Sequence, residues 1–116
     1  MADEVPSLDE VRRRLIELIE ADEWRITERA ERTGRAFLRG VVPVPTQLSI
    51  VRHVLHLLRQ ADCSLIPVPM GEPPGSHGLG YRVQDPGSHH LYIKVKIEED
   101  LAWIISFKES DHRGGP

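Results

Sequence analysis

The chain has 116 residues, a length that suits one compact domain and leaves no room for a second. Its formal net charge of -3 argues against a protein that is basic all over, so any binding of nucleic acid must be local. The single cysteine, Cys63, excludes an intramolecular disulfide and fits a reducing compartment. We expect one domain over residues 1–116, with flexible tails at 1–6 and 109–116.

Membrane and secretion signals are missing from the sequence as it stands. No run approaches the roughly 18 consecutive apolar residues that a membrane-spanning helix needs. The start Met1-Ala2-Asp3-Glu4 lacks the basic and apolar regions of a signal peptide. The sequence therefore predicts a soluble, cytoplasmic protein without a membrane partner.

The first third of the chain carries helix signals. Ser7 and Glu10 have the spacing of a capping box, and apolar residues then recur at three- and four-residue steps, which predicts a helix over about 7–21. Thr27 can cap a short second helix, which Gly34 is expected to interrupt.

Prolines and glycines divide the middle of the chain. Prolines keep residues 40–45 extended, and Thr46 then caps a helix that continues to about residue 60. The apolar segment 64–69 contains two prolines, which confines it to an edge strand or an extended segment. Residues 71–80 read as a loop, a strand restarts at Tyr81, and Asp85-Pro86-Gly87 reads as a turn.

Two runs near the C-terminus, 90–97 and 101–108, predict a β-hairpin. In the first run the odd positions are aliphatic and the even positions are basic or phenolic, the period of a strand with one buried face. A three-residue turn at 98–100 keeps the large apolar groups, including Trp103, on one side. The expected pairs are Ile97 with Leu101, Val95 with Trp103, Ile93 with Ile105, Leu91 with Phe107, and His90 with Lys108.

This register gathers all three lysines of the chain on the other face of the hairpin. The residues expected there are His90, Tyr92, Lys94, Lys96 and Lys108. If Gln84 lies opposite Ser88, Arg82 joins them. The predicted fold class is α+β, with two or three N-terminal helices packed on one face of a three- to four-stranded antiparallel sheet.

A cluster of cations with a phenol and an imidazole, and without an acidic pair or a metal-ligand set, suits an anionic ligand whose charge grows during reaction. RNA cleavage without a metal fits this description. A base takes the proton of the 2'-hydroxyl, an acid protonates the leaving 5'-oxygen, and cations stabilise the phosphorane. The plainer interpretation is a solvated strand face, since antiparallel sheets commonly expose one polar face and lysine discourages edge pairing.

The hairpin also resembles a known family. The segment Leu91-Tyr92-Ile93-Lys94-Val95-Lys96-Ile97, a short acidic turn, and a second run ending Ile-Ile-Ser-Phe-Lys are similar to the C-terminal hairpin of the MqsR family of bacterial mRNA interferase toxins, whose fold is related to RelE-type ribonucleases. A fainter similarity covers residues 21–27. The resemblance implies a small sheet covered by helices, ribonuclease activity without a metal or other cofactor, and an antitoxin partner.

The resemblance also implies roles for individual residues. Tyr92 and Lys108 match active-site positions of the family, and Lys94 matches an adjacent basic position. The family's other active-site lysine and glutamine have no secure counterpart, although Arg82 and Gln84 are candidates by position. The cleavage specificity of the family does not transfer, because the proline-rich and glycine-rich stretches of this chain differ from it.

We therefore expect a toxin-type endoribonuclease that acts on single-stranded RNA, with mRNA and a cognate antitoxin protein as partners. Tyr92 and His90 are the proton-transfer candidates, and Lys94 and Lys108 are the stabilising cations. The expected RNA contacts come from Lys96, Arg82 and Gln84. The alternative is a non-catalytic binding module that holds an acidic partner protein on the same face.

Other residues carry weaker signals. His53 and His56 have a spacing that can offer two imidazoles to one metal, but no third and fourth ligand follow at zinc-site spacing, so no metal site is predicted. Cys63 is interpreted as a buried, inert thiol. The triplet Arg12-Arg13-Arg14 is most simply the solvated face of the first helix.

Overall fold

The computed structural model describes residues 7–69, 78–84 and 91–109. The predicted turn at 85–87, most of the predicted loop at 71–80, and the predicted tails 1–6 and 110–116 lie outside these ranges. The elements are α1 (Leu8–Glu20), β1 (Trp24–Ile26), α2 (Glu28–Leu38), α3 (Gln47–Leu58), β2 (Ser64–Pro69), β3 (Leu79–Gln84), β4 (Leu91–Glu98) and β5 (Leu101–Glu109). Glu109, predicted to begin a tail, is the last residue of β5.

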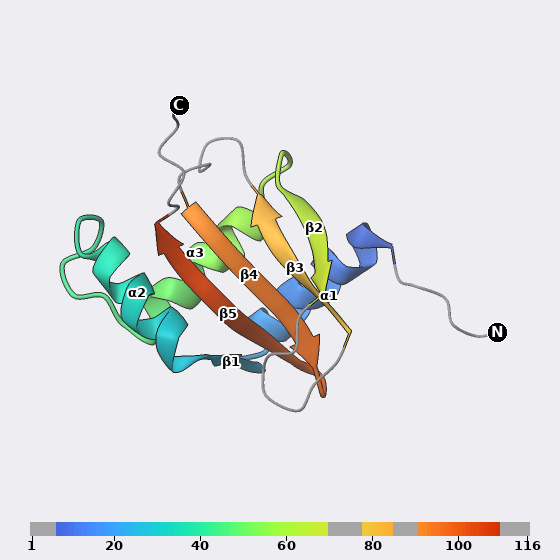
Figure 1. The fold of residues 1–116 in the computed structure, drawn as a ribbon, viewed down its shortest axis with the longest axis horizontal. Coiled ribbons are helices and arrows are strands. Elements are labelled where there is room, and N and C mark those ends of the chain that lie inside the picture. Colours follow the sequence, from blue (N-terminus) through green and yellow to red (C-terminus); the bar gives the residue numbers. More distant parts are fainter. Residues whose placement is uncertain (1–6, 70–77, 85–90, 110–116) are drawn as a thin grey trace.

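The predicted α+β class is confirmed, and the three helices precede β2 to β5 (Figure 1). The predicted three- to four-stranded antiparallel sheet is wrong, because the described residues form a mixed sheet of five strands in the order β1-β5-β4-β3-β2. The additional strand β1 pairs with β5 in parallel. Backbone bonds from Ala102 N to Glu23 O and from Thr27 N to Ile104 O continue this pairing beyond the ends of β1. Three residues are too few to show a period, so a strand could not be predicted there.

Two capped helices cover one face of the sheet. The predicted capping box at Ser7 and Glu10 is present at the start of α1, and Thr46 caps α3 as expected. Figure 1 shows α1 and α3 behind the sheet. Their buried residues form one core with the covered face of the strands, including Leu15, Ile50, Val54, Ile93, Ile104 and Phe107. Burial of this surface, at about 25 cal/mol per Å², is the main force that holds the layers together.

The helix α2 continues through Gly34, which was expected to interrupt it. A Cβ atom at this position would lie 2.7 Å from Ile50 Cδ1 and 3.2 Å from Phe107 Cδ1. The glycine is therefore required by the close approach of α2 to α3 and β5. This contact offsets the roughly 1 kcal/mol that glycine costs relative to alanine in a helix.

One edge of the sheet, formed by β2, was predictable from sequence. β2 is an edge strand, as its prolines predicted, and Pro67 and Pro69 lie opposite Tyr81 and Leu79 of β3. Since proline has no backbone N–H, a strand with two of them is tolerated only where one side needs no ladder bonds.

The β4–β5 hairpin differs from the predicted register. Its connection has two residues, Glu99 and Asp100, both with positive φ (53° and 59°), the conformation of a tight hairpin turn. Near the turn Lys96 lies opposite Trp103, so Trp103 shares the face of Lys96 and the prediction that it faces the core is wrong. A bulge at Ile105, which has no partner on β4, then shifts the register by one residue. Beyond the bulge Phe107 lies in the core, and the period of two is restored.

Candidate anion-binding site

Tyr92 of β4 is surrounded by three cations on the face of the sheet opposite α1 and α3. The Cζ atom of Arg82 lies 5.5 Å from the centroid of the Tyr92 ring, and the Nζ atoms of Lys94 and Lys108 lie 5.6 and 5.5 Å from it. These distances are in the range of cation–π attraction, which holds flexible side chains against an aromatic ring. The predicted convergence of these four residues on one face is confirmed.

Strand register brings each cation to the ring. Lys108 lies directly opposite Tyr92, and Arg82 lies directly opposite Lys94. The prediction had placed both Lys108 and Arg82 opposite His90. It is wrong by two residues for Lys108 and by four residues for Arg82. Both shifts are even, so Lys108 and Arg82 keep their predicted face. The observed register brings Lys108 closer to Tyr92 than the predicted one.

A small pocket of about 190 Å³ opens beside the ring, between the sheet and α2. Its lining residues are Arg29, Thr33, Tyr92, Lys94, Ser106 and Lys108. Figure 1 shows α2 beside β5, and two hydroxyl groups dock it there. Thr27 Oγ1 donates to the carbonyl of Ile105 (3.0 Å), and Thr33 Oγ1 donates to the carbonyl of Phe107 (2.6 Å). The helix therefore forms one wall of the pocket.

The pocket has an excess of positive charge. Its lining includes Arg29, Lys94 and Lys108 but no carboxylate. Within residues 7–69, 78–84 and 91–109, no carboxylate forms an ion pair with Arg82, Lys94 or Lys108. Arg82, Lys94 and Lys108, which have no carboxylate partner within these ranges, attract an anion, and the phenol and hydroxyl groups beside them add neutral donors.

The structure separates the remaining predicted site residues from this pocket. Lys96 faces the same side as Lys94, but its side chain is 2% exposed and its Nζ lies 3.7 Å from Glu98 Oε1, so the prediction of an accessible RNA contact is wrong for it. Strand alternation fixes the face of a residue and does not fix what packs over it. Gln84 is exposed at the end of β3 and does not line the pocket. His90 lies outside the described residues.

The weaker sequence signals also have a place in the structure. Cys63 is buried, as predicted. The ring of His53 packs edge-on against Phe107, with 5.6 Å between centroids, so it supports the core. Arg12 donates to the carbonyls of Gln60 and Cys63, and thereby ties α1 to the end of α3. Over the described ranges, no three His, Cys, Asp or Glu side chains are grouped as metal ligands.

Sequence reasoning missed three residues of the pocket: Arg29, Thr33 and Ser106. Arg29 and Thr33 are four residues apart, so they lie on one side of α2. That spacing marks a polar pair on a helix, but only the docking of α2 against β5 shows that the pair meets the lysines.

Comparisons of the chain with family models, with curated proteins and with solved structures find no match. The likeness to MqsR toxins consequently remains a hypothesis that rests on the hairpin residues. Across the described part of the chain, no helix has the length and apolar character needed to cross a membrane.

Proposed function

We propose that this chain is a toxin-type endoribonuclease that cleaves single-stranded RNA without a metal ion. The observation that carries the proposal is the convergence of Arg82, Lys94 and Lys108 on the Tyr92 ring, beside a pocket without a carboxylate lining. A phosphodiester is an anion that gains charge as it is attacked. Preorganised cations therefore stabilise its transition state more than its ground state.

The pocket size indicates what part of the RNA it holds. A volume of about 190 Å³ equals roughly six water molecules at about 30 Å³ each, enough for a phosphate and adjoining ribose oxygens. The bases would then lie on the sheet surface outside the pocket. A strand whose bases are unpaired can adopt this arrangement more easily than a duplex.

The proposed reaction is an intramolecular transesterification of the RNA. The 2'-oxygen attacks the phosphorus while a base takes its proton, the bond from phosphorus to the 5'-oxygen breaks, and an acid protonates that oxygen. The products are a 2',3'-cyclic phosphate and a 5'-hydroxyl end. In this proposal Tyr92 takes part in proton transfer, and Lys94, Lys108 and Arg82 stabilise the phosphorane, with Arg29 at the wall of α2. The second proton-transfer candidate, His90, lies outside the described residues.

The test is RNA cleavage by the purified protein. A defined single-stranded RNA is incubated with the protein, with and without a chelator, and the cleaved ends are identified. We expect cleavage that the chelator does not abolish. Tyr92→Phe and Lys108→Ala should each lower the rate by about 100-fold or more, with an unchanged thermal unfolding midpoint.

Matched controls are available on the helix-covered side. Tyr81→Phe removes a phenol hydroxyl from the covered face, and Arg13→Ala removes a cation from the exposed surface of α1. Both controls should keep the wild-type rate. Full cleavage by folded Tyr92→Phe and Lys108→Ala would refute the assignment.

A non-catalytic function is the second proposal, because the same donors suit a carboxylate as well as a phosphate. In that case an acidic partner protein would occupy the pocket. Saturable binding of an acidic peptide, lost in Lys108→Ala and unaccompanied by any RNA cleavage, would favour it.

A toxin of this type would also require an antitoxin partner. Growth arrest on expression, relieved by Tyr92→Phe, would support that part of the proposal. Unimpaired growth with active wild-type protein in the cell would count against it.

A further inference from the structure

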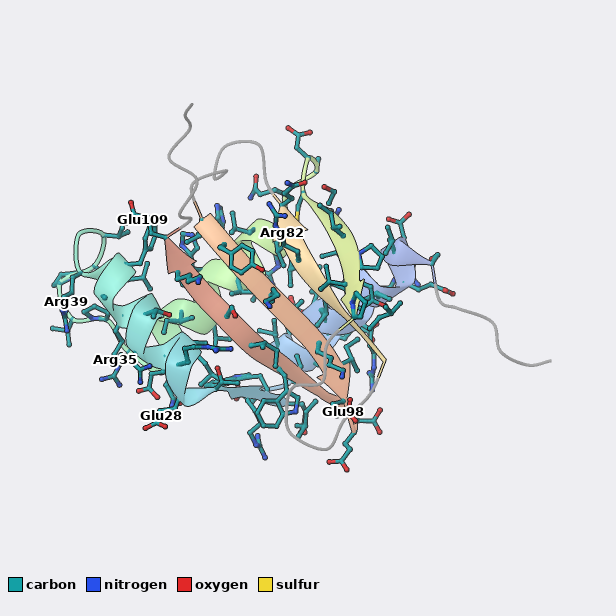
Figure 2. All side chains as sticks on the ribbon, in the orientation of Figure 1. Glu28, Arg35, Arg39, Arg82, Glu98 and Glu109 are labelled. Atoms are coloured by element: carbon teal, nitrogen blue, oxygen red, sulfur yellow. The ribbon has the colours of Figure 1, made fainter. Side chains whose placement is uncertain are left out.

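A second group of arginines lies on α2, outside the pocket. Arg32, Arg35 and Arg39 are exposed and line a shallow hollow of about 370 Å³ together with Glu28 and Glu31. Figure 2 shows Arg35 and Arg39 on the side of α2 that points away from the sheet. The core and the Tyr92 site do not explain this concentration of arginine.

One carboxylate in the hollow, that of Glu31, already has two partners within the protein. Glu31 Oε2 lies 2.8 Å from Arg35 Nη2, and Glu31 Oε1 accepts a hydrogen bond from Gln47 Nε2 at 2.8 Å. Glu28 is the first residue of α2, where the helix dipole favours a negative charge. In the portion of the chain that the structure describes, Arg32 and Arg39 form no ion pair. Their two charges are therefore available to a ligand.

The hollow and the pocket share no lining residue, but α2 contributes residues to both. Arg29 lines the pocket, Arg32 lies one turn further along α2, and Arg39 lies two turns beyond that. At about 1.5 Å per residue, Arg29 and Arg39 are separated by about 15 Å along the axis. One strand of a B-form helix rises by about 3.4 Å per phosphate along its axis, so a stacked strand covers this length with about four phosphates.

We infer that Arg32 and Arg39 hold phosphates of the RNA strand that flank the phosphodiester in the Tyr92 pocket. This inference rests on the proposed function and adds a path for the substrate beyond the reacting group. It makes affinity depend on RNA length, because a short RNA fills the pocket without reaching the outer side of α2.

The test compares two RNA lengths and two double variants. A labelled dinucleoside monophosphate, which has a single phosphodiester, and a labelled single strand of about a dozen nucleotides are titrated by fluorescence anisotropy over a range of salt concentrations. The test variant is Arg32→Ala with Arg39→Ala. The control is Arg13→Ala with Arg52→Ala, which removes two exposed arginines from α1 and α3.

We expect the test variant to bind the longer RNA about 25-fold more weakly at ~0.1 M salt, with a salt slope smaller by about 1.4, the value for two contacts to a single strand. Binding of the dinucleoside monophosphate should stay unchanged, and the control should match the wild type for both RNAs. Equal losses for the two lengths, an unaltered slope, or no binding of RNA by the wild type would overturn the inference.

The outcomes separate this inference from the proposed function. If the wild type binds the longer RNA through Arg32 and Arg39 but cleaves no RNA, the proposed nuclease activity is refuted and the proposed phosphate contacts are supported. If the test variant and the wild type both cleave RNA with the same dependence on its length, the nuclease activity is supported and the phosphate contacts of Arg32 and Arg39 are refuted.

Discussion

Lys94 and Lys96 lie two residues apart on the same face of β4, but their surroundings differ. Lys94 is partly exposed, lines the pocket and lies over the Tyr92 ring. Lys96 is buried near Glu98, at the end of the strand next to the acidic turn. Figure 2 shows Glu98 at this end of the sheet and Arg82 toward the other.

The difference shows that one alternating pattern can serve two purposes. At the pocket end Lys94, which has no carboxylate partner among the described residues, is available to an anion. At the turn end a lysine near a carboxylate is part of the packed structure, where a buried charge is tolerated because it is paired. Substitutions at the two lysines and in α2 test this difference.

The largest effect is expected for cleavage at the pocket end. Lys94→Ala should lower kcat/KM for RNA by about 100- to 1000-fold, because it removes a charge that stabilises the transition state. Lys96→Met, which keeps most of the side-chain volume, should stay within about threefold of the wild type. Similar losses in both folded variants, measured by steady-state kinetics, would mean that the two lysines do not differ in function.

For the free energy of unfolding, the larger loss is expected at Lys96 and the smaller one at Lys94. Lys96→Ala should lower the free energy of unfolding by about 2–3 kcal/mol, since it leaves a cavity and removes the partner of Glu98. Lys94→Ala should change it by less than about 0.5 kcal/mol. Urea unfolding measures both values. A larger loss for Lys94→Ala would contradict the assignment of Lys96 to the packed structure.

A substitution in α2, the helix that forms one wall of the pocket, should have a smaller effect on stability. Gly34→Ala should destabilise the fold by about 1–2 kcal/mol, because the new Cβ would lie 2.7 Å from Ile50 Cδ1 and overpacking exceeds the gain in helix propensity. The control is Gly40→Ala, where a Cβ meets no atom within 4 Å. Thermal unfolding compares the two variants. Equal stability would show that α2 can move away from α3 without cost.

The smallest effect is expected at Thr33. Thr33→Val removes the hydroxyl that donates to the carbonyl of Phe107, which should cost about 1 kcal/mol of unfolding free energy. Thr33→Ser should restore most of it, as it restores the donor. A serine variant no more stable than the valine variant would show that the methyl group, and not this hydrogen bond, holds α2 against β5.

Local chemistry made much of the fold predictable. The caps at Ser7, Thr27 and Thr46 begin all three helices, since a short polar side chain satisfies a free backbone N–H there. The strand β1 could not be predicted, because three residues carry no period and their pairing depends on β5. The continuation of α2 through Gly34 likewise depends on contacts that exist only in the folded protein.

In the β4–β5 hairpin, the alternating pattern predicted the faces of the site residues but not the turn length or the bulge. Strand alternation correctly placed Tyr92, Lys94 and Lys108 on one face, but it was applied with a turn of the wrong length. Glu99 and Asp100 adopt positive φ without glycine or asparagine, so their identity did not signal a two-residue turn. The bulge at Ile105 then compensated for the shorter turn. Arg29 joins the site through tertiary docking, which no local pattern specifies.

The prolines of β2 have a consequence for self-association. Pro67 and Pro69 are two residues apart, so they remove two hydrogen-bond donors from the same side of the edge strand. A second molecule that approached this border would find an interrupted row of donors and could not extend the sheet as a continuous ladder. This end of the sheet is thereby protected against fibril-like growth at high protein concentration.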